Sequence, residues 1–261
     1  PKAGWTAMRV MRLFRKHPSV RYRGAIHETI WEAVQKRLAA GEGEIGQSRI
    51  VFDHHGFDGD QYKKHLRNIP LLLKELQRDP HQLWHRYHLA HCYYDLGRKE
   101  EAETLWYDNV RRLRGKGRFS LLHSLSHVSL IRHMLDEGQD AEPLLEEALS
   151  IFPESPDLTW LCGRLRMSQG RFEKAIPCFE RLIFWGRQGD YDPSIAYEER
   201  IFDAYPYEAL AVCYFRQSMF REAARYFEIV QTFHPGSVEH KIKARLCAAM
   251  AEKRPGNPEA P

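Results

Sequence analysis

The sequence predicts a mainly helical protein made of stacked helical hairpins, with a short segment of mixed α and β character in front of them. Between about residues 80 and 253, four segments carry a small residue that is followed twelve positions later by alanine. A large apolar residue follows each alanine by four positions, and a turn-forming residue lies between the two small ones. The first 56 residues lack this repeat and alternate apolar with polar side chains instead, which is typical of strands.

The small residues and the turns explain why each segment should fold as two packed helices. Two helices approach closely only where the side chains at their crossing are small, and a turn residue ends the first helix with little strain. The small pairs are Ala90 and Ala102, Ser129 and Ala141, Gly163 and Ala175, and Ala211 and Ala223. The large residues are Trp106, Leu145, Phe179 and Phe227, and the expected turns are at Gly97, Asp136, Gly170 and Ser218. Because neither helix can bury its apolar face alone, the hairpins must stack.

This arrangement resembles the tetratricopeptide repeat of 34 residues. Residues 89–102, 170–175 and 211–235 carry the resemblance, whereas the segment around Ser129 matches less well. Extra residues lie near 115–120 and 187–203, and the second insertion has the composition of a loop. The resemblance implies an α-solenoid over residues 80–253 that ends in a capping helix from residue 237, followed by a flexible tail at residues 254–261.

In such an array, the first helix of each hairpin is expected to line a concave face that binds a partner. Aromatic residues and arginine are the residue types that most often anchor partners. By helical spacing, the expected groove residues are Trp84, Tyr87, His91, Tyr94, Trp160, Arg164, Tyr205 and Glu208. The alternative for each aromatic residue is a place in the core between repeats.

Four histidines stand close together at the start of the array. His81, His85, His88 and His91 have helical spacing, and imidazoles at such spacing can bind a transition metal. No cysteine or glutamate completes a familiar metal motif, so a histidine-rich helix surface is the simpler interpretation.

Composition and charge are those of an ordinary globular protein. Of the 261 residues, 43% are hydrophobic and 28% are charged, with a formal net charge of +4. No apolar run reaches the roughly 20 residues that cross a bilayer, and no signal-peptide pattern opens the chain. The five cysteines are scattered without a Cys-x-x-Cys pair, which indicates reduced thiols in a cytoplasmic protein.

The first 27 residues are basic, with seven lysines or arginines and no acidic residue. Such a patch fits a phosphate-bearing ligand, nucleic acid or an anionic surface, or is simply a solvated edge. A nucleic-acid binder would need aromatic residues nearby for base stacking, and only Trp5, Phe14 and Tyr22 lie there. Nucleic acid is therefore the least favoured partner.

The first 56 residues predict three strands and one short helix. The strands are expected at residues 9–15, 21–30 and 47–52, the helix at residues 31–40, and a connecting helix at residues 57–79. Three strands in so few residues cannot close a sheet with its own core. They are expected to complete a sheet whose other strands lie upstream. Because this chain also begins at Pro1 without a methionine, it is interpreted as a piece of a longer protein.

Several short motifs in this region resemble bacterial family 2 glycosyltransferases, in which a GT-A catalytic domain runs directly into tetratricopeptide repeats. The resemblance covers residues 9–73. The motifs, in their order, are Arg12-Leu13-Phe14-Arg15, then Tyr22-Arg23-Gly24-Ala25-Ile26-His27-Glu28, then residues 50–57, and then Lys64-x-x-Arg67-Asn68-x-x-Leu71-Leu72. The resemblance makes residues 1–56 the end of a GT-A-like domain.

This resemblance implies sugar transfer from a nucleotide-sugar in the parent enzyme, with Mn²⁺ or Mg²⁺ as its divalent metal. It gives His27 a catalytic and metal-binding role beside Glu28, and it places Arg23, His54 and His55 near the donor diphosphate. In the alternative interpretation, His27 and Glu28 only end a strand and begin a helix. The family's donor-binding half and its Asp-x-Asp metal motif are missing, so this chain is expected to hold no cofactor and to be inactive alone.

Two functional interpretations remain from the sequence. In the first, the chain is the C-terminal part of a glycosyltransferase whose repeats bind a protein or glycan acceptor. In the second, it is a protein–protein interaction scaffold without a link to glycosyltransferases.

Overall fold

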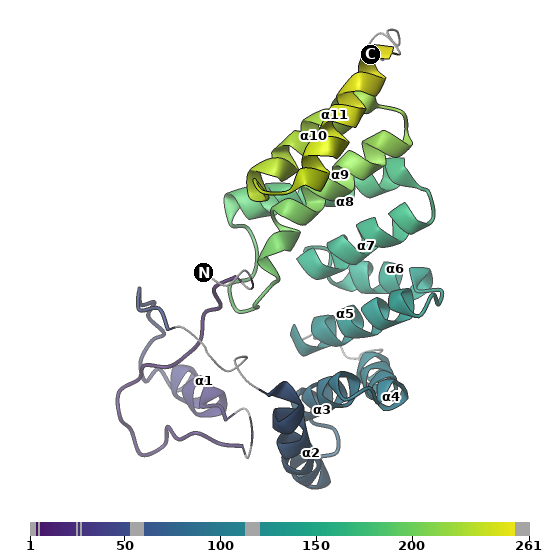
Figure 1. The fold of residues 1–261 in the computed structure, drawn as a ribbon. Helices are drawn as coiled ribbons and strands as arrows, with labels where there is room; N and C mark the ends of the chain where they lie inside the picture. The colour runs from purple at the N-terminus through teal and green to yellow at the C-terminus, as the bar shows by residue number, and fades with distance from the viewer. Residues whose placement is uncertain are drawn as a thin grey trace. The chain divides into compact units, whose positions relative to one another are not determined.

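The computed structural model describes residues 4, 6–24, 26, 28–52, 60–112 and 121–253, with only the backbone described at residues 121–123. These residues are mainly helical and belong to two compact units. The first unit comprises residues 11–130, and the second comprises residues 1–10 together with residues 131–261. In the first unit α2, α3 and α4 stack in sequence, and in the second unit the helices from α6 to α11 do so (Figure 1).

The first unit contains α1 to α4 and the beginning of α5. Their bounds are α1 Trp31–Ala39, α2 Gln61–Arg78, α3 Leu83–Asp95, α4 Lys99–Arg111 and α5 Leu121–Asp136. α2 begins after Asp60, whose carboxylate accepts the Lys63 N–H at 3.1 Å. α2 packs on α3 and α3 on α4, around a core of Ile26, Leu72, Leu89 and Cys92.

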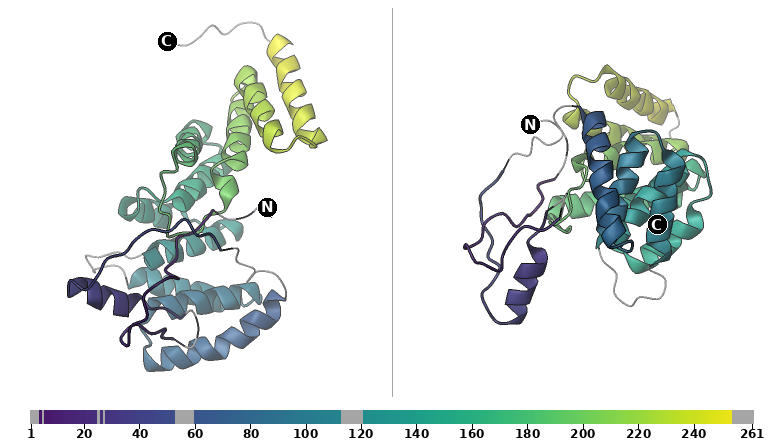
Figure 2. Two further views of the ribbon diagram at one scale, coloured as in Figure 1. Left: turned by 90° about the vertical axis from the view of Figure 1, so that its left-hand side faces the viewer. Right: turned by 90° about the horizontal axis from the view of Figure 1, so that it is seen from below.

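The second unit contains the end of α5 and the helices that follow. Their bounds are α6 Glu142–Ile151, α7 Pro156–Ser168, α8 Phe172–Gln188, the 3-10 helix η1 Glu199–Ile201, α9 Ala204–Arg216, α10 Phe220–Phe233 and α11 Val238–Lys253. From α6 to α11, each α-helix packs on the next (Figures 1 and 2). The main core gathers Phe179, Leu182, Tyr197 and Leu210 from successive elements.

The spacing of small and large residues correctly predicts the helix crossings of three hairpins, α3–α4, α7–α8 and α9–α10. The side chains of Ala90, Ala102, Ala175, Ala211 and Ala223 are fully buried, as is Phe179. At Gly163 the approach is closest, since a Cβ atom there would lie 2.5 Å from the Phe179 ring. α7 and α8 can therefore meet at this distance only because residue 163 has no side chain.

Three of the four predicted turns are confirmed, and the fourth is wrong. Gly97, Gly170 and Ser218 follow their helices with φ values of 79°, 70° and 61°. Asp136 is instead the last residue of α5, and Gly138 takes the left-handed conformation with φ 69°. Glycine adopts this conformation without the steric cost that a side chain brings, so the chain turns at Gly138, two residues after α5 ends.

The three predicted strands do not form in the described residues. The β pairing recorded inside the first unit is one isolated antiparallel bridge, between Arg23 and Thr29. Apart from this bridge and α1, the described residues between 11 and 52 are irregular. Leu13, Val51 and Phe52 remain 60%, 80% and 61% exposed. A strand needs a neighbour for its N–H and C=O groups and a core for its apolar face, and alternation of side chains supplies neither. The fold is therefore mainly helical and tetratricopeptide-like, without the predicted α/β remnant of a GT-A-like sheet.

Candidate functional site

The first unit presents a cluster of aromatic side chains along α3. Trp84, Tyr87, His91 and Tyr94 are all half-buried and recur at helical spacing, so they share one side of the helix. The Tyr87 and His91 rings are 4.5 Å apart, and the rings of His91 and Tyr94 each lie 5.4 Å from that of Trp106 on α4. The cluster is thus partly hairpin packing and partly accessible surface.

A buried polar network in the same unit could not be recognised from the sequence as functional or structural. Asn109, only 1% exposed, accepts a hydrogen bond from Arg86 Nε at 3.0 Å and donates one to Ser126 Oγ at 3.3 Å. Arg86 also pairs with Asp108 at 2.7 Å. The only signal in the sequence is an asparagine in a stretch where Trp106 and Val110 mark the buried side of α4. The network satisfies its buried polar atoms, so it stabilises the packing of α3, α4 and α5.

In the second unit, the predicted residues Trp160, Arg164, Tyr205 and Glu208 come from α7 and α9. The rings of Trp160 and Tyr205 stack at 5.6 Å with an interplanar angle of 21°. The Trp160 ring also meets the buried Phe179 edge to face at 5.5 Å, which fixes its position. The stacked pair joins the first helices of two successive hairpins, and both residues remain half-buried.

Charged side chains of the same two helices form ion pairs with neighbouring helices. Arg164 pairs with Asp136 at 3.4 Å. Glu208 pairs with His240 at 3.3 Å and with Lys243 at 3.5 Å, both from α11. An aromatic platform with partly exposed ion pairs on its helices has the composition of a protein-binding surface.

Glu198 and Arg200 lie next to this platform and were missed by the sequence analysis. Arg200 of η1 lies 4.7 Å above the Tyr205 ring and pairs with Glu198 at 2.8 Å. Burial raises the pKa of the Tyr205 hydroxyl, and the nearby carboxylate of Glu198 raises it further. Both residues lie in the predicted loop between α8 and α9, and nothing in its composition indicated that it would fold back on α9.

Asp157, in the first turn of α7, has a largely buried carboxylate. Its side chain is 16% exposed, and burial raises its pKa to about 6. Arg132, 3.9 Å away, favours the charged form, whereas Glu198 opposes it. Asp157 therefore ionises near neutral pH rather than near pH 4.

The residues assigned to a glycosyltransferase site are not brought together as a site in the described residues. Arg23 exchanges backbone hydrogen bonds of 3.0 Å with Thr29, and Glu28 is exposed. His27, His54 and His55 lie outside the described residues, so their predicted roles stay predictions.

The histidine cluster does not gather around one point. His81 meets Arg112 at 2.7 Å, whereas His91 meets Ser129 at 3.2 Å. Across the described ranges, no group of three histidine, cysteine or acidic side chains is placed to hold a metal ion.

A histidine between a thiol and a carboxylate lies at the contact of α2 and α3. His65 Nδ1 is 3.4 Å from Cys92 Sγ, and His65 Nε2 is 3.1 Å from Asp95. Nucleophilic cysteines use such a thiol–imidazole–carboxylate arrangement, but they need an accessible thiolate. Burial raises the pKa of Cys92 to about 11, and its side chain is only 4% exposed. The Cys92 thiol therefore stays protonated, and its contact with His65 is structural.

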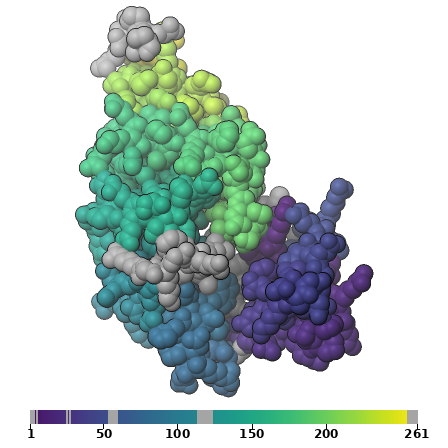
Figure 3. Space-filling model, turned by 180° about the vertical axis from the view of Figure 1, so that it is seen from behind, coloured from purple at the N-terminus to yellow at the C-terminus, as the bar shows by residue number. Residues whose placement is uncertain are grey.

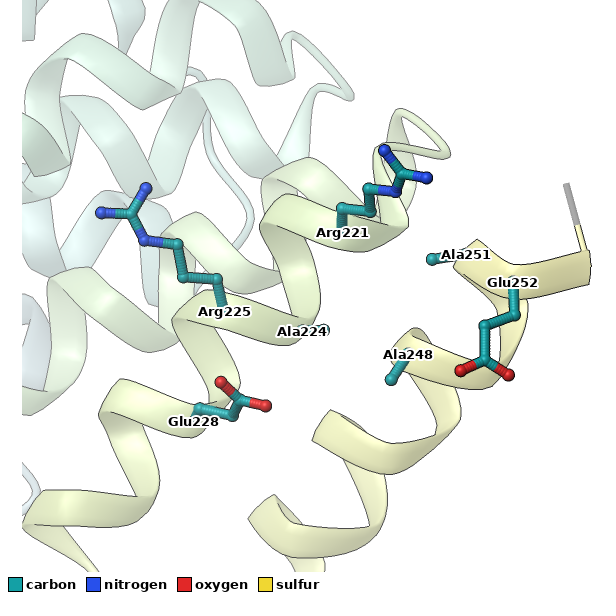
Figure 4. Close-up of a pocket in the computed structure, with 7 residues that line it drawn as sticks. All are labelled: Arg221, Ala224, Arg225, Glu228, Ala248, Ala251 and Glu252. Carbon is teal, nitrogen blue, oxygen red and sulfur yellow. The ribbon is translucent and has the colours of Figure 1, made fainter. Parts of the chain in front are cut away.

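A shallow recess lies between α10 and α11 (Figure 4). Its inner side is formed by Ala224, Ala248 and Ala251, whose short side chains leave space between the helices. Arg221, Arg225, Glu228 and Glu252 complete its lining. The recess lacks the large side chains that anchor a partner, so the aromatic platform is the stronger candidate.

Comparison with known proteins identifies repeats in both units. Two family models described as tetratricopeptide repeat match, one at residues 86–105 and the other at residues 135–196. The first spans α3 and the start of α4, and the second runs from the end of α5 to the loop after α8. No curated protein matches the chain. None of the helices in the described ranges is long and apolar enough to cross a membrane.

Three solved structures are similar to the chain. MamA of AMB-1 has a TM-score of 0.48 and 18% identity, over 70% of this chain and 90% of that chain. TTC0263, a thermophilic TPR protein of Thermus thermophilus, has a TM-score of 0.42 and 17% identity, over 72% and 94%. The Cut9–Hcn1 hetero-tetramer of APC/C has a TM-score of 0.41 and 16% identity, over 71% and 40%. From the family models, we conclude that each compact unit of this chain contains tetratricopeptide repeat sequence.

Proposed function

We propose that the chain is a protein–protein interaction module that binds a peptide segment of a partner across the Trp160–Tyr205 platform. The observation that supports this most is the stacking of two half-buried aromatic rings from the first helices of successive hairpins. Family models for tetratricopeptide repeats match in both units, and repeats of this type commonly serve as binding surfaces.

The platform has the physical properties of an anchor site. Trp160 is held by the fully buried Phe179, so its ring loses little freedom when a partner binds. Tyrosine and tryptophan contribute most to affinity when a ring of polar groups keeps water out. The ion pairs of Arg164 and Glu208 provide that ring and offer both signs of charge to the ends of a bound segment.

The aromatic cluster on α3 is a second place on the same module where a partner can bind. Tyr87, His91 and Tyr94 are the predicted groove residues there, and they too are half-buried. Because they belong to the other compact unit, we treat this cluster as a separate surface.

The proposal is tested by selecting peptides that bind the full chain from a random display library. Affinities of the selected peptides are then measured by fluorescence anisotropy for the chain, Tyr205→Ala and Tyr107→Ala. Tyr107 is the matched control, because it is a 50% exposed tyrosine on α4, which belongs to the other compact unit. We expect Tyr205→Ala to weaken binding at least about tenfold, as for an anchor residue, and Tyr107→Ala to leave it unchanged.

Circular dichroism must show that both variants keep their helices. If no peptide is enriched over a selection on the heat-unfolded chain, the interaction proposal is wrong. If the two tyrosine variants bind equally well, the platform is not the site.

A glycosyltransferase parent is the second candidate, and it rests on the order of motifs in residues 9–73 alone. None of the family models and solved structures reported above is a glycosyltransferase. Because this chain lacks the donor-binding half, calorimetric titration with a UDP-sugar and Mn²⁺ tests it on a form extended upstream by about 200 residues, near a usual domain size. Binding that His27→Ala abolishes would favour this candidate, and an absence of heat would favour the scaffold.

A further inference from the structure

The loop between α8 and α9, residues 189–203 and hereafter the insert, is a well-packed structure. The rings of Tyr191 and Phe202 stack at 4.6 Å, and the Tyr197 ring meets Phe202 at 5.6 Å. Tyr197 and Ile201 are each only 2% exposed. At Gly186, a Cβ atom would lie 2.6 Å from Phe202, so the end of α8 forms a close-fitting notch for the insert. The backbone of the insert is therefore held in place by its own side chains.

The N-terminal segment, of which the structure describes residues 4 and 6–9, pairs with the edge of this insert and belongs to the same compact unit. The Thr6 N–H donates to the Tyr197 carbonyl at 2.8 Å, and the Glu199 N–H donates to the Gly4 carbonyl at 2.9 Å. Further along, the Arg9 N–H donates to the Pro193 carbonyl at 2.7 Å. The partners run in opposite directions along the chain, so the two segments pair in an antiparallel manner. The N-terminal segment lies beside the insert in Figures 1 and 2, and Figure 3 shows the insert, in green, at the surface.

Among the described residues, most of the recognition between the two segments is through the backbone. One described side chain takes part, since the Tyr197 N–H donates to Thr6 Oγ1 at 3.0 Å. Met8 and Val10 are each 47% exposed, and Ala7 and Arg9 are also on the surface. The insert thus contributes a fixed edge, whereas the segment contributes backbone groups that nearly any extended chain could supply.

We propose that the edge of the insert is a peptide-binding site of the strand-addition type, which residues 4–9 occupy as an internal ligand. In strand addition, main-chain hydrogen bonds provide affinity and a few side-chain positions provide specificity. The partner that fits is an extended protein segment, with serine or threonine at the position of Thr6 and a residue other than proline there. The hydroxyl is needed to accept the Tyr197 N–H, and the backbone N–H is needed to reach the Tyr197 carbonyl.

The insert adjoins the Trp160–Tyr205 platform through Arg200, but Tyr205→Ala and Thr6→Pro test the two sites with different peptides, so failure of one proposal is distinguishable from failure of the other. Binding of an external peptide at the edge of the insert is regulated, because the internal ligand and its site belong to the same chain. A tethered segment acts at a high effective concentration, so an external peptide must compete with it. The site opens only when residues 4–9 leave the insert.

The test uses the full chain and its Thr6→Pro variant, together with a fluorescent peptide that copies residues 4–12. Proline lacks both the N–H and the hydroxyl of Thr6, so the variant is expected to release the internal segment. Anisotropy should then show at least about tenfold tighter peptide binding to the variant than to the unchanged chain, because the competitor is gone. A matched peptide with proline at the Thr6 position should bind neither chain.

The receiving side of the site provides a second variant. Glu199→Pro removes the N–H that pairs with Gly4, and proline fits there because Glu199 begins η1 and Glu198 has φ −65° and ψ 117°. Combined with Thr6→Pro, it should abolish binding of the peptide. Hydrogen exchange should show the Glu199 amide protected in the unchanged chain, exposed in Thr6→Pro, and protected again when peptide is added.

Three outcomes would overturn the proposal. The first is a Glu199 amide that stays protected in Thr6→Pro without any peptide binding, which would make the N-terminal segment a fixed part of the fold. The second is equal binding of the two peptides, and the third is equal binding to the unchanged chain and to Thr6→Pro.

Discussion

Residues 11–52 and the α7–α8 hairpin both carry regularly spaced apolar side chains, yet they bury them very differently. In the hairpin, Phe179 and Leu182 are fully buried, whereas Leu13 and Val51 are 60% and 80% exposed. The hairpin contains two apolar faces that meet each other, and its neighbours cover the rest. The N-terminal residues alternate without a paired strand beside them in the described chain. Periodicity thus predicts burial only when the complementary surface is close in the same fold.

The largest expected difference between these regions comes from removing one phenyl ring from each. Phe179→Ala should lower the free energy of unfolding by about 4 kcal/mol, because it leaves a cavity between α7 and α8. Phe52→Ala, at a position 61% exposed, should change it by less than about 0.5 kcal/mol. Urea denaturation followed by circular dichroism measures both. Equal losses would show that residues 11–52 are packed more tightly than their exposure indicates.

A similar pair of substitutions tests close helix approach. Gly163→Ala should cost about 3 kcal/mol, since the new methyl group would lie 2.5 Å from a phenyl ring that has no room to move. Gly46→Ala has no atom within 4 Å of its Cβ and an ordinary backbone conformation, so it should be nearly neutral. Thermal unfolding of the two variants gives the comparison. Combining Gly163→Ala with Phe179→Leu should restore part of the loss, and a lack of any recovery would argue against the contact as its cause.

Asp157 tests whether packing of the hairpins also changes ionisation. Its folded-state pKa of about 6 lies above the usual value of about 4 for an aspartate, so the folded state binds its proton more tightly. Between about pH 4 and pH 6 the unfolded chain loses this proton first, and stability falls as pH rises; above pH 6 the loss is constant. The free energy of unfolding of Asp157→Asn minus that of the unchanged chain should therefore be about 1–3 kcal/mol larger at pH 7.5 than at pH 4.

Denaturation midpoints of the unchanged chain and Asp157→Asn at the two pH values provide the measurement. A stability difference between the two proteins that is the same at pH 4 and pH 7.5 would contradict the raised pKa.

The smallest expected effect compares equivalent turns among the hairpins. Ser218 has φ 61° at the position that glycine holds in Gly97 and Gly170. Ser218→Gly should stabilise the chain by roughly 0.5–1 kcal/mol, because a left-handed conformation strains a residue with a side chain. The matched change, Gly170→Ser, should destabilise it by a similar amount. A rise in melting temperature for Ser218→Gly is the expected result, and a fall would indicate that the serine makes a stabilising contact of its own.

The first helices of the hairpins were the part of the candidate site that could be predicted. Trp160 and Tyr205 were identified because helical spacing places them on one side of α7 and α9. Their mutual stacking could not be predicted, because the distance between the two helices depends on Gly163, Phe179 and the packed insert. Asp157 and Arg200 were missed for the same reason, since burial and ring contacts arise only when separate elements meet.

The sequence by itself determined the helical hairpins, their crossings at Ala90, Ala102, Gly163 and Ala175, and the aromatic residues on their first helices. These features follow from local periodicity, which acts within one or two turns of helix. Only the tertiary structure decided that residues 11–52 form no sheet in the described chain and that Thr6 pairs with Tyr197, 191 positions away. Such pairing depends on which backbone groups remain available after the helices have packed, and no local pattern encodes that.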